Sequence, residues 1–212
     1  MRHKLEYGVG LFQQQDYQHN KALYESIALT HLPGAAMITC VDARIDPSSL
    51  THTAPNELSV ERTLGNVPSK AYLEFVIKGK GVKDVVLCGH SDCGAVQGSL
   101  YPDTVAHLEH TTQELKATIP NRNALLEGFE QGDEVRYAVL RNLIYQRDKM
   151  LGYDFVQEAI RENGLKVHTW YYDIGSGDVL IFDEETQQFI PLTTDAADAT
   201  VSGHTGASEV VP

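Results

Sequence analysis

The sequence predicts an α/β protein whose core is a mainly parallel β-sheet flanked by helices. Short runs rich in β-branched residues alternate with longer amphipathic segments, the order typical of strand–helix–strand units. The run Val85-Val86-Leu87-Cys88 is apolar throughout, as expected of a parallel strand buried on both faces. With 212 residues, the chain is long enough to bury a substantial core in one domain.

Composition narrows the class of protein. Hydrophobic residues make up 42% of the chain and charged residues 22%, as in ordinary globular proteins. The formal net charge of −12 argues against nucleic acid or a membrane surface as a partner. We find no apolar run of about 18 residues that would predict a transmembrane helix, and residues 1–7 lack the apolar stretch of a signal peptide. Three cysteines are too few for a disulfide framework and fit a reducing cytoplasmic location.

The first expected element is a polar helical arm. Within residues 3–30, Leu23 and Ile27 recur at helical spacing, and Pro33-Gly34 ends the segment. We therefore expect a single domain over residues 1–192, with an arm over 1–32 and an α/β core over 35–192. Four apolar residues of the arm have no obvious partner in a monomer, which predicts a homodimer or a higher homo-oligomer: Leu5, Val9, Leu11 and Phe12.

The core segments follow in order. We expect strands at Ala35–Cys40, 57–62, 84–88 and 165–172, with mostly helix over 105–163. Gly164 stands where a helix C-cap is expected, and residues 171–182 resemble a closing hairpin. Residues 193–212 are small and polar, which predicts a flexible tail or one that orders only against a partner subunit.

Three metal-ligating side chains follow two of these strands. Cys40 ends the first strand, and His90 and Cys93 follow the third. The carboxyl ends of parallel strands meet at the sheet edge where α/β proteins bind ligands. Two thiolates and one imidazole leave one tetrahedral position of Zn²⁺ open for water or substrate, which is typical of a catalytic site.

Each cysteine also has an ordinary structural explanation. A single cysteine is most often a small apolar core residue, and a lone histidine is most often satisfied by hydrogen bonds. The combined spacing of Cys40, His90 and Cys93 favours the metal site over this alternative. Cys88 is different, because it lies within the strand and alternation points its side chain away from that site. We assign Cys88 to the core.

Asp42 and Arg44 share the parity of Cys40, so all three side chains point to one side of an extended segment. Arg44 could hold Asp42 ionised through a bidentate pair. Asp42 could then accept a hydrogen bond from a zinc-bound water, or could itself occupy the fourth zinc position. The alternative is an ordinary surface ion pair that contributes little to the stability of the fold.

The motif Cys-x-Asp-x-Arg followed by His-x-x-Cys, on apolar strands, resembles the β-class carbonic anhydrases. The similarity extends to residues 38–47, 73–76, 81–96 and 167–177. It implies a parallel core of about four strands with an added antiparallel strand, and an arm that wraps a neighbouring subunit. It further implies one Zn²⁺ per subunit on Cys40, His90 and Cys93, with Asp42 and Arg44 as the catalytic pair.

The activity implied by this resemblance is reversible hydration of CO₂ to bicarbonate and a proton by zinc-bound hydroxide. Hydrolysis of COS or CS₂ on the same scaffold is one alternative. A non-catalytic zinc-binding protein is a second, and the presence of both Asp42 and Arg44 argues against it.

The chain departs from the family pattern around the expected substrate pocket. His31 stands where the family has a glutamine, Ser59 where it has a phenylalanine, and Phe75 where it has a tyrosine. Leu64 stands where the family string Arg-Asn-Ala-Gly-Asn has its alanine. These four residues and Gly94 are the expected pocket residues. His31 could replace the hydrogen bond of the glutamine, shuttle protons, or simply lie exposed at the end of the arm. The altered polarity and volume motivate the COS and CS₂ alternative.

Overall fold

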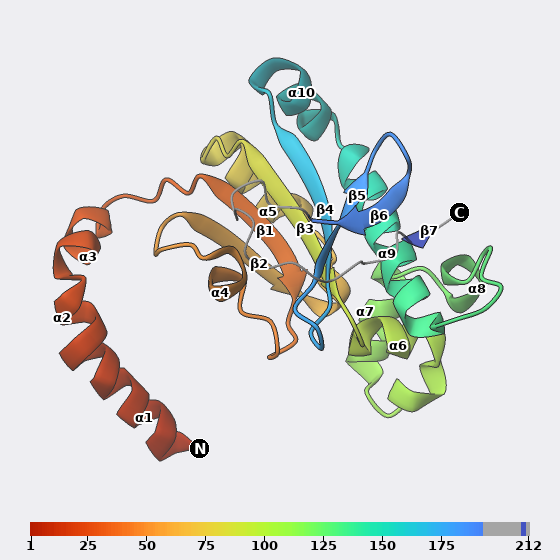
Figure 1. Ribbon diagram of the computed structural model, residues 1–212, viewed down its shortest axis with the longest axis horizontal. Coiled ribbons are helices and arrows are strands. Elements are labelled where there is room, and N and C mark those ends of the chain that lie inside the picture. Colours follow the sequence, from red (N-terminus) through yellow and green to blue (C-terminus); the bar gives the residue numbers. More distant parts are fainter. Residues whose placement is uncertain (193–208, 211–212) are drawn as a thin grey trace, which may run out of the picture.

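The computed structural model describes residues 1–192 and 209–210 (Figure 1). A helical arm precedes a seven-stranded sheet with the strand order β2-β1-β3-β4-β5-β6-β7. The parallel part of this sheet confirms the predicted fold class. The tail prediction for residues 193–212 lies outside the described residues, apart from the short strand β7.

Four neighbouring strands form the parallel part of the sheet: β2 (Leu58–Thr63), β1 (Ala35–Cys40), β3 (Asp84–His90) and β4 (Lys166–Tyr172). Strand β1 has the predicted bounds, and β2 lies one residue later than predicted. Strand β3 runs past its predicted end because Gly89 and His90 still pair with Tyr171 and Tyr172 of β4. His90 is therefore the last residue of a strand and not a loop residue.

The antiparallel part has three strands where the sequence predicted one: β5 (Val179–Asp183), β6 (Gln188–Pro191) and β7 (Glu209–Val210). Strands β4 and β5 form the expected hairpin. A second hairpin adds β6, and its turn is held by Asp183, whose Oδ1 accepts the backbone N–H groups of Glu185 and Thr186 at 3.1 and 2.7 Å. Residues 184–187 contain no glycine or proline, so the usual turn signal is missing from the sequence.

Helices and short helical turns connect the strands and follow β3. In chain order they are α4 (Pro47–Thr51), η2 (Leu64–Asn66), α5 (Lys70–Glu74), η3 (Phe75–Gly79), α6 (Gly94–Leu100), η4 (Pro102–Val105), α7 (Glu109–Thr118), α8 (Arg122–Leu125), α9 (Glu134–Leu151) and α10 (Asp154–Asn163). Gly164 caps α10 with a left-handed φ of 67°, which confirms the predicted C-cap.

Two apolar clusters occupy the two faces of the sheet. The larger core contains Ile38 and Leu87 from the strands and Leu143 from α9, all with no exposed surface. The smaller cluster, on the other face, is formed by Met37, Val86 and Cys88. Cys40 belongs to the larger core and Cys88 to the smaller one, so Cys88 is a core residue that faces away from Cys40, as predicted.

The N-terminal arm is helical, as predicted, and projects from the body of the molecule (Figure 1). It consists of α1 (Arg2–Leu11), the π-helical turn η1 (Phe12–Asp16), α2 (Tyr17–His19) and α3 (Lys21–Ile27), and none of their residues is buried. Within the described residues, no helix combines the length and the apolar character needed to cross a membrane.

Candidate metal centre

Cys40, His90 and Cys93 meet at one edge of the sheet. Cys40 and His90 are the last residues of the neighbouring parallel strands β1 and β3, and Cys93 is the N-cap of α6. Their ligand atoms all lie within 4.8 Å of one another, and all three residues are buried. The structure thus brings together the three residues that the sequence singled out, in a cluster that could hold a metal ion.

The spacing of the cluster suits a tetrahedral metal. The sulfur atoms of Cys40 and Cys93 are 4.0 Å apart. Two thiolates bound to one tetrahedral Zn²⁺ at about 2.3 Å would lie roughly 3.8 Å apart. A zinc ion therefore needs little rearrangement of these two side chains.

The ring of His90 is oriented for metal binding. Its Nδ1 lies 2.9 Å from the carbonyl oxygen of Ser91, which can only accept, so Nδ1 carries the proton. The lone pair is then on Nε2, which is buried and has no hydrogen-bond partner among the described residues. A backbone carbonyl that fixes the tautomer is a usual support for a metal-ligating histidine.

Hydrogen bonds around the two sulfur atoms favour negative charge there. The thiol of Cys93 lowers the pKa of Cys40 by hydrogen bonding, and the backbone N–H groups of Asp42 and Gly65 lower it further. The Cys40 sulfur and burial raise the pKa of Cys93, while the N–H groups of Ala95 and Val96, in the first turn of α6, lower it. Ionisation of Cys40 therefore opposes ionisation of Cys93. A cation between the sulfurs would allow both to ionise.

Asp42 is held beside the cluster by Arg44. Arg44 donates from its backbone N–H and from Nε to Oδ1 of Asp42, both at 3.0 Å, and from a terminal nitrogen to Oδ2 at 2.8 Å. These hydrogen bonds keep the pKa of Asp42 far below its usual range. Oδ2 of Asp42 lies 3.9 Å from Nε2 of His90, so the carboxylate faces the candidate site. The predicted Asp42–Arg44 pair is present, next to the cluster.

Two residues that the sequence analysis did not single out also support this pair. Arg62, on β2, donates to the carbonyl oxygens of Cys40 and Asp42 at 3.0 and 2.5 Å. Asp92 has a left-handed φ of 56°, and its Oδ2 accepts a hydrogen bond from a terminal nitrogen of Arg44 at 3.1 Å. In the sequence, Asp92 lies between the candidate ligands His90 and Cys93, and this position could have identified it as a residue of the site.

The five expected pocket residues do not all reach the cluster within one chain. Leu64 follows Thr63, the β2 partner of Cys40, and Gly94 follows Cys93. Ser59 pairs with Ala36, about four residues or roughly 13 Å back along the strand, and accepts a hydrogen bond from Tyr72 at 3.0 Å. His31 and Phe75 pack against each other with ring centroids 5.9 Å apart, and both are exposed.

Comparisons with known proteins agree with this geometry. A family model described as carbonic anhydrase matches residues 35–179, which contain the whole cluster. A carbonic anhydrase of Pseudomonas aeruginosa is 31% identical over 211 residues, covering 92% of this chain and 94% of the relative. One from Helicobacter pylori strain J99 is 31% identical over 202 residues, covering 85% and 90%.

Solved structures show the same fold. The β-carbonic anhydrase CcaA superposes with a TM-score of 0.82 at 26% identity, covering 90% of this chain and 99% of CcaA. A β-carbonic anhydrase of Sordaria macrospora gives a TM-score of 0.67 at 23% identity, covering 84% and 95%. The family match, the relatives and the shared fold together show that the chain belongs to the β-class carbonic anhydrase family.

Proposed function

We propose that this chain is a zinc-dependent carbonic anhydrase that catalyses the reversible hydration of CO₂ to bicarbonate and a proton. The observation that carries the proposal is the buried cluster of Cys40, His90 and Cys93 with the ionised Asp42 beside it. The carbonic anhydrase names of the relatives support the same activity.

The donor set fits Zn²⁺. Two thiolates and an imidazole are ligands that zinc favours, and three protein ligands leave a fourth position open. When bound, Zn²⁺ would lower the pKa of a water ligand from about 15.7 toward 7 and so make a nucleophile available at neutral pH. The carbonyl oxygen of Ser91 orients the ring of His90 and leaves Nε2 available to a metal, and backbone N–H groups face both sulfur atoms.

Asp42 is assigned the role of a hydrogen-bond acceptor. Because Arg44 keeps it ionised, Asp42 accepts a hydrogen bond from a group in the site that carries a proton, and so orients that group. Asp42 does not itself donate a proton near neutral pH. Arg62 positions the backbone of Cys40 and Asp42. In the other possibility raised by the sequence, Asp42 would itself bind the metal, and in this structure both of its oxygen atoms accept hydrogen bonds from Arg44.

The test combines metal content with stopped-flow CO₂ hydration. We expect about one Zn²⁺ per subunit, and for Asp42→Asn an unchanged zinc content with at least a roughly 100-fold loss of turnover. Asp103→Asn, an exposed carboxylate on η4, is the matched control and should keep full activity. Loaded protein that does not hydrate CO₂ would favour the non-catalytic alternative, and protein that binds no zinc would refute the metal assignment.

COS and CS₂ are the competing substrates. Among the substitutions that motivated them, Ser59 pairs with Ala36, about four residues back along the strand from Cys40, and His31 and Phe75 pack against each other. These contacts do not discriminate between CO₂ and the larger sulfur-containing substrates, and the carbonic anhydrase names of the relatives favour CO₂. Release of H₂S from COS by a protein inactive on CO₂ would reverse this order.

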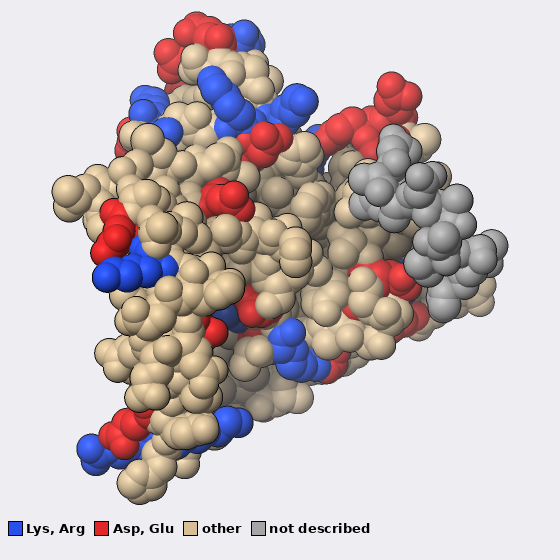
Figure 2. Space-filling view, turned by 60° about the vertical axis from the view of Figure 1, so that its left-hand side comes forward, with Lys and Arg blue, Asp and Glu red and all other residues tan. Residues whose placement is uncertain are grey.

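We also propose that the chain forms a homodimer or a higher homo-oligomer. Leu5, Tyr7 and Val9 on α1 are more than half exposed. On the face shown in Figure 2, charged side chains are separated by wide areas of uncharged residues. Burying the apolar residues of the arm against a second copy would remove them from water. Light scattering at micromolar concentration tests this, and a monomer would contradict it.

All three cysteines are free thiols. A reducing compartment would keep Cys40 and Cys93 available as ligands, so we propose the cytoplasm as the location.

A further inference from the structure

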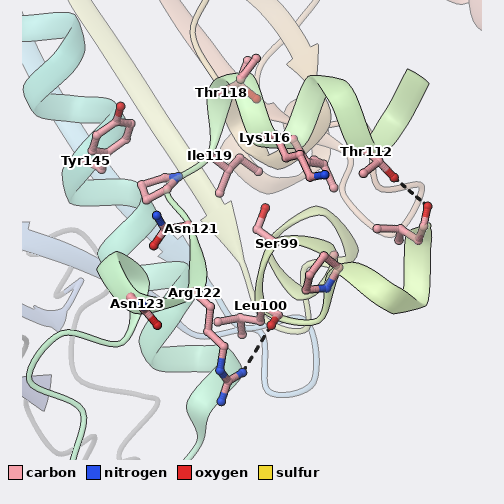
Figure 3. A pocket seen from close by; sticks show the side chains of 16 residues that line it. Ser99, Leu100, Thr112, Lys116, Thr118, Ile119, Asn121, Arg122, Asn123 and Tyr145 are labelled. Atoms are coloured by element: carbon pink, nitrogen blue, oxygen red, sulfur yellow. Dashed lines mark hydrogen bonds between the residues drawn. The ribbon is translucent and has the colours of Figure 1, made fainter. Parts of the chain in front are cut away.

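A cavity that none of the three candidate metal ligands lines is found between α6, α7, α8 and α9 (Figure 3). Its volume is about 540 Å³, which is within the range of small-molecule binding sites. Its apolar wall includes Leu100, Val105, Leu115 and Ile119. Apolar walls with a few polar groups are typical of ligand pockets.

The charges in the lining are all of one sign. Lys116 and Arg122 are the charged residues that line the cavity, and no acidic side chain does. The chain as a whole carries 29 acidic and 17 basic residues, so the lining differs in sign from the net charge of the protein. A pocket of this kind favours a ligand that carries negative charge.

The two cations are not equivalent. Arg122 forms an ion pair with Glu134, and its guanidinium lies over the ring of Tyr101 at 5.2 Å. Lys116, on α7, has no carboxylate within ion-pair distance among the described residues. The charge that remains for a ligand is therefore that of Lys116.

Ser99 supplies a second polar group on the same cavity. It lies near the end of α6, and Figure 3 shows Ser99 and Lys116 on neighbouring helices beside the same hollow. Its hydroxyl is buried and makes no hydrogen bond within the described part of the chain. A buried hydroxyl without a partner is costly, and an acceptor on a ligand would offset that cost.

We propose that this cavity binds a small organic monocarboxylate, with the carboxylate at Lys116 and Ser99 and the apolar body against Leu100, Val105 and Ile119. The ligand class follows from one free cation, one unpaired donor and an apolar wall. The proposal concerns binding alone and does not depend on CO₂ hydration by the metal centre.

The test is calorimetric titration of the zinc-loaded protein with octanoate, with 1-octanol as the uncharged control. Octanoate should bind more tightly than octanol. Lys116→Gln should weaken octanoate binding roughly tenfold, the effect of one charge-assisted contact. Ser99→Ala should weaken it about threefold. Lys149→Gln removes the same charge from the exposed surface of α9 and should change nothing.

Chemical-shift mapping with ¹⁵N-labelled protein distinguishes this cavity from the metal centre, which could also attract a carboxylate. The proposal expects the largest shifts at residues of α6 and α7 that line the cavity, such as Gly98 and Thr112. Shifts confined to Ser91 and Gly94 would overturn it, as would equal binding of octanol or unchanged affinity in Lys116→Gln.

Discussion

The side-chain amide of Asn142 donates a hydrogen bond to the carbonyl oxygen of Gly65 at 3.1 Å. Asn142 lies on α9 and is completely buried. Its own oxygen accepts a hydrogen bond from Gln146 at 3.1 Å, and Gln146 also donates to the carbonyl of Thr118 at 2.8 Å. Since the N–H of Gly65 faces the sulfur of Cys40, this buried network connects α9 to the candidate metal centre.

Replacing Asn142 with leucine should destabilise the protein by about 2–4 kcal/mol. The substitution leaves the carbonyl of Gly65 without this donor and removes one acceptor of Gln146, and each buried unpaired group costs about 1–3 kcal/mol. Urea unfolding at fixed protein concentration measures the change. Lys149→Ala, on the exposed surface of the same helix, is the control. A difference below about 0.5 kcal/mol would show that the network contributes little.

Gly65 and Gly164 offer a matched pair for separating backbone strain from crowding. Both have φ 67° and ψ 28°. A Cβ on Gly65 would lie 2.6 Å from Cδ1 of Ile119, whereas a Cβ on Gly164 would meet nothing within 4 Å. Gly164→Ala should cost about 1 kcal/mol for the left-handed conformation alone. Gly65→Ala should cost a further 1–3 kcal/mol or so for overpacking. Equal losses in thermal or urea unfolding would contradict the crowding argument.

Cys88 should make the protein sensitive to alkaline pH. Burial raises the pKa of Cys88 from 9.0 to about 12. The folded state therefore keeps the thiol protonated while the unfolded state loses its proton above pH 9. Stability is unaffected by this group below pH 9 and falls as the pH rises toward 12. At pH 10.5 the loss should be about 2 kcal/mol, from about 1.4 kcal/mol per pH unit.

Comparison with Cys88→Ala isolates this effect. Between pH 8 and pH 10.5, the unfolding free energy of the wild type should fall by about 2 kcal/mol relative to that of the variant, because the variant lacks the titrating group. Any loss from the smaller side chain is present at both pH values and cancels. Parallel stability curves for the two proteins would show that Cys88 does not titrate between the two states in this range.

Removal of the metal, which rests on the proposed zinc binding, should change the reactivity of the thiols. In the zinc-loaded protein we expect no rapid reaction with a disulfide reagent, because Cys40 and Cys93 would be ligands and Cys88 is buried. After chelation, Cys40 should react because its pKa is held low, while Cys93, which is buried and has a raised pKa, and Cys88 stay protected until the chain unfolds.

Cys88→Ala provides the control for this count. The variant should show the same single reactive thiol after chelation as the wild type. Reaction of all three thiols in the wild type would mean that metal removal unfolds the sheet, and no change in reactivity on chelation would argue against cysteine ligation.

The sequence by itself determined the fold class, the arm and the candidate metal-ligating triad. Apolar runs located β1 with its true bounds, and because Cys40 ends one run while His90 and Cys93 follow another, the three residues were placed at one sheet edge. These properties are local, or follow from the rule that parallel strands end at a common edge. The Asp42–Arg44 pair was equally readable because its partners are two residues apart.

Only the tertiary structure decided which distant residues support that site. Arg62 reaches Cys40 from the neighbouring strand, and Asn142 reaches Gly65 from α9. Ser59 shares the sequence context of the expected pocket, but its register with Ala36 places it far from the cluster. A single sequence carries no periodic signal for one buried amide meeting one distant carbonyl. Packing of the helices against the sheet selects these contacts, so they appear only once the chain is folded.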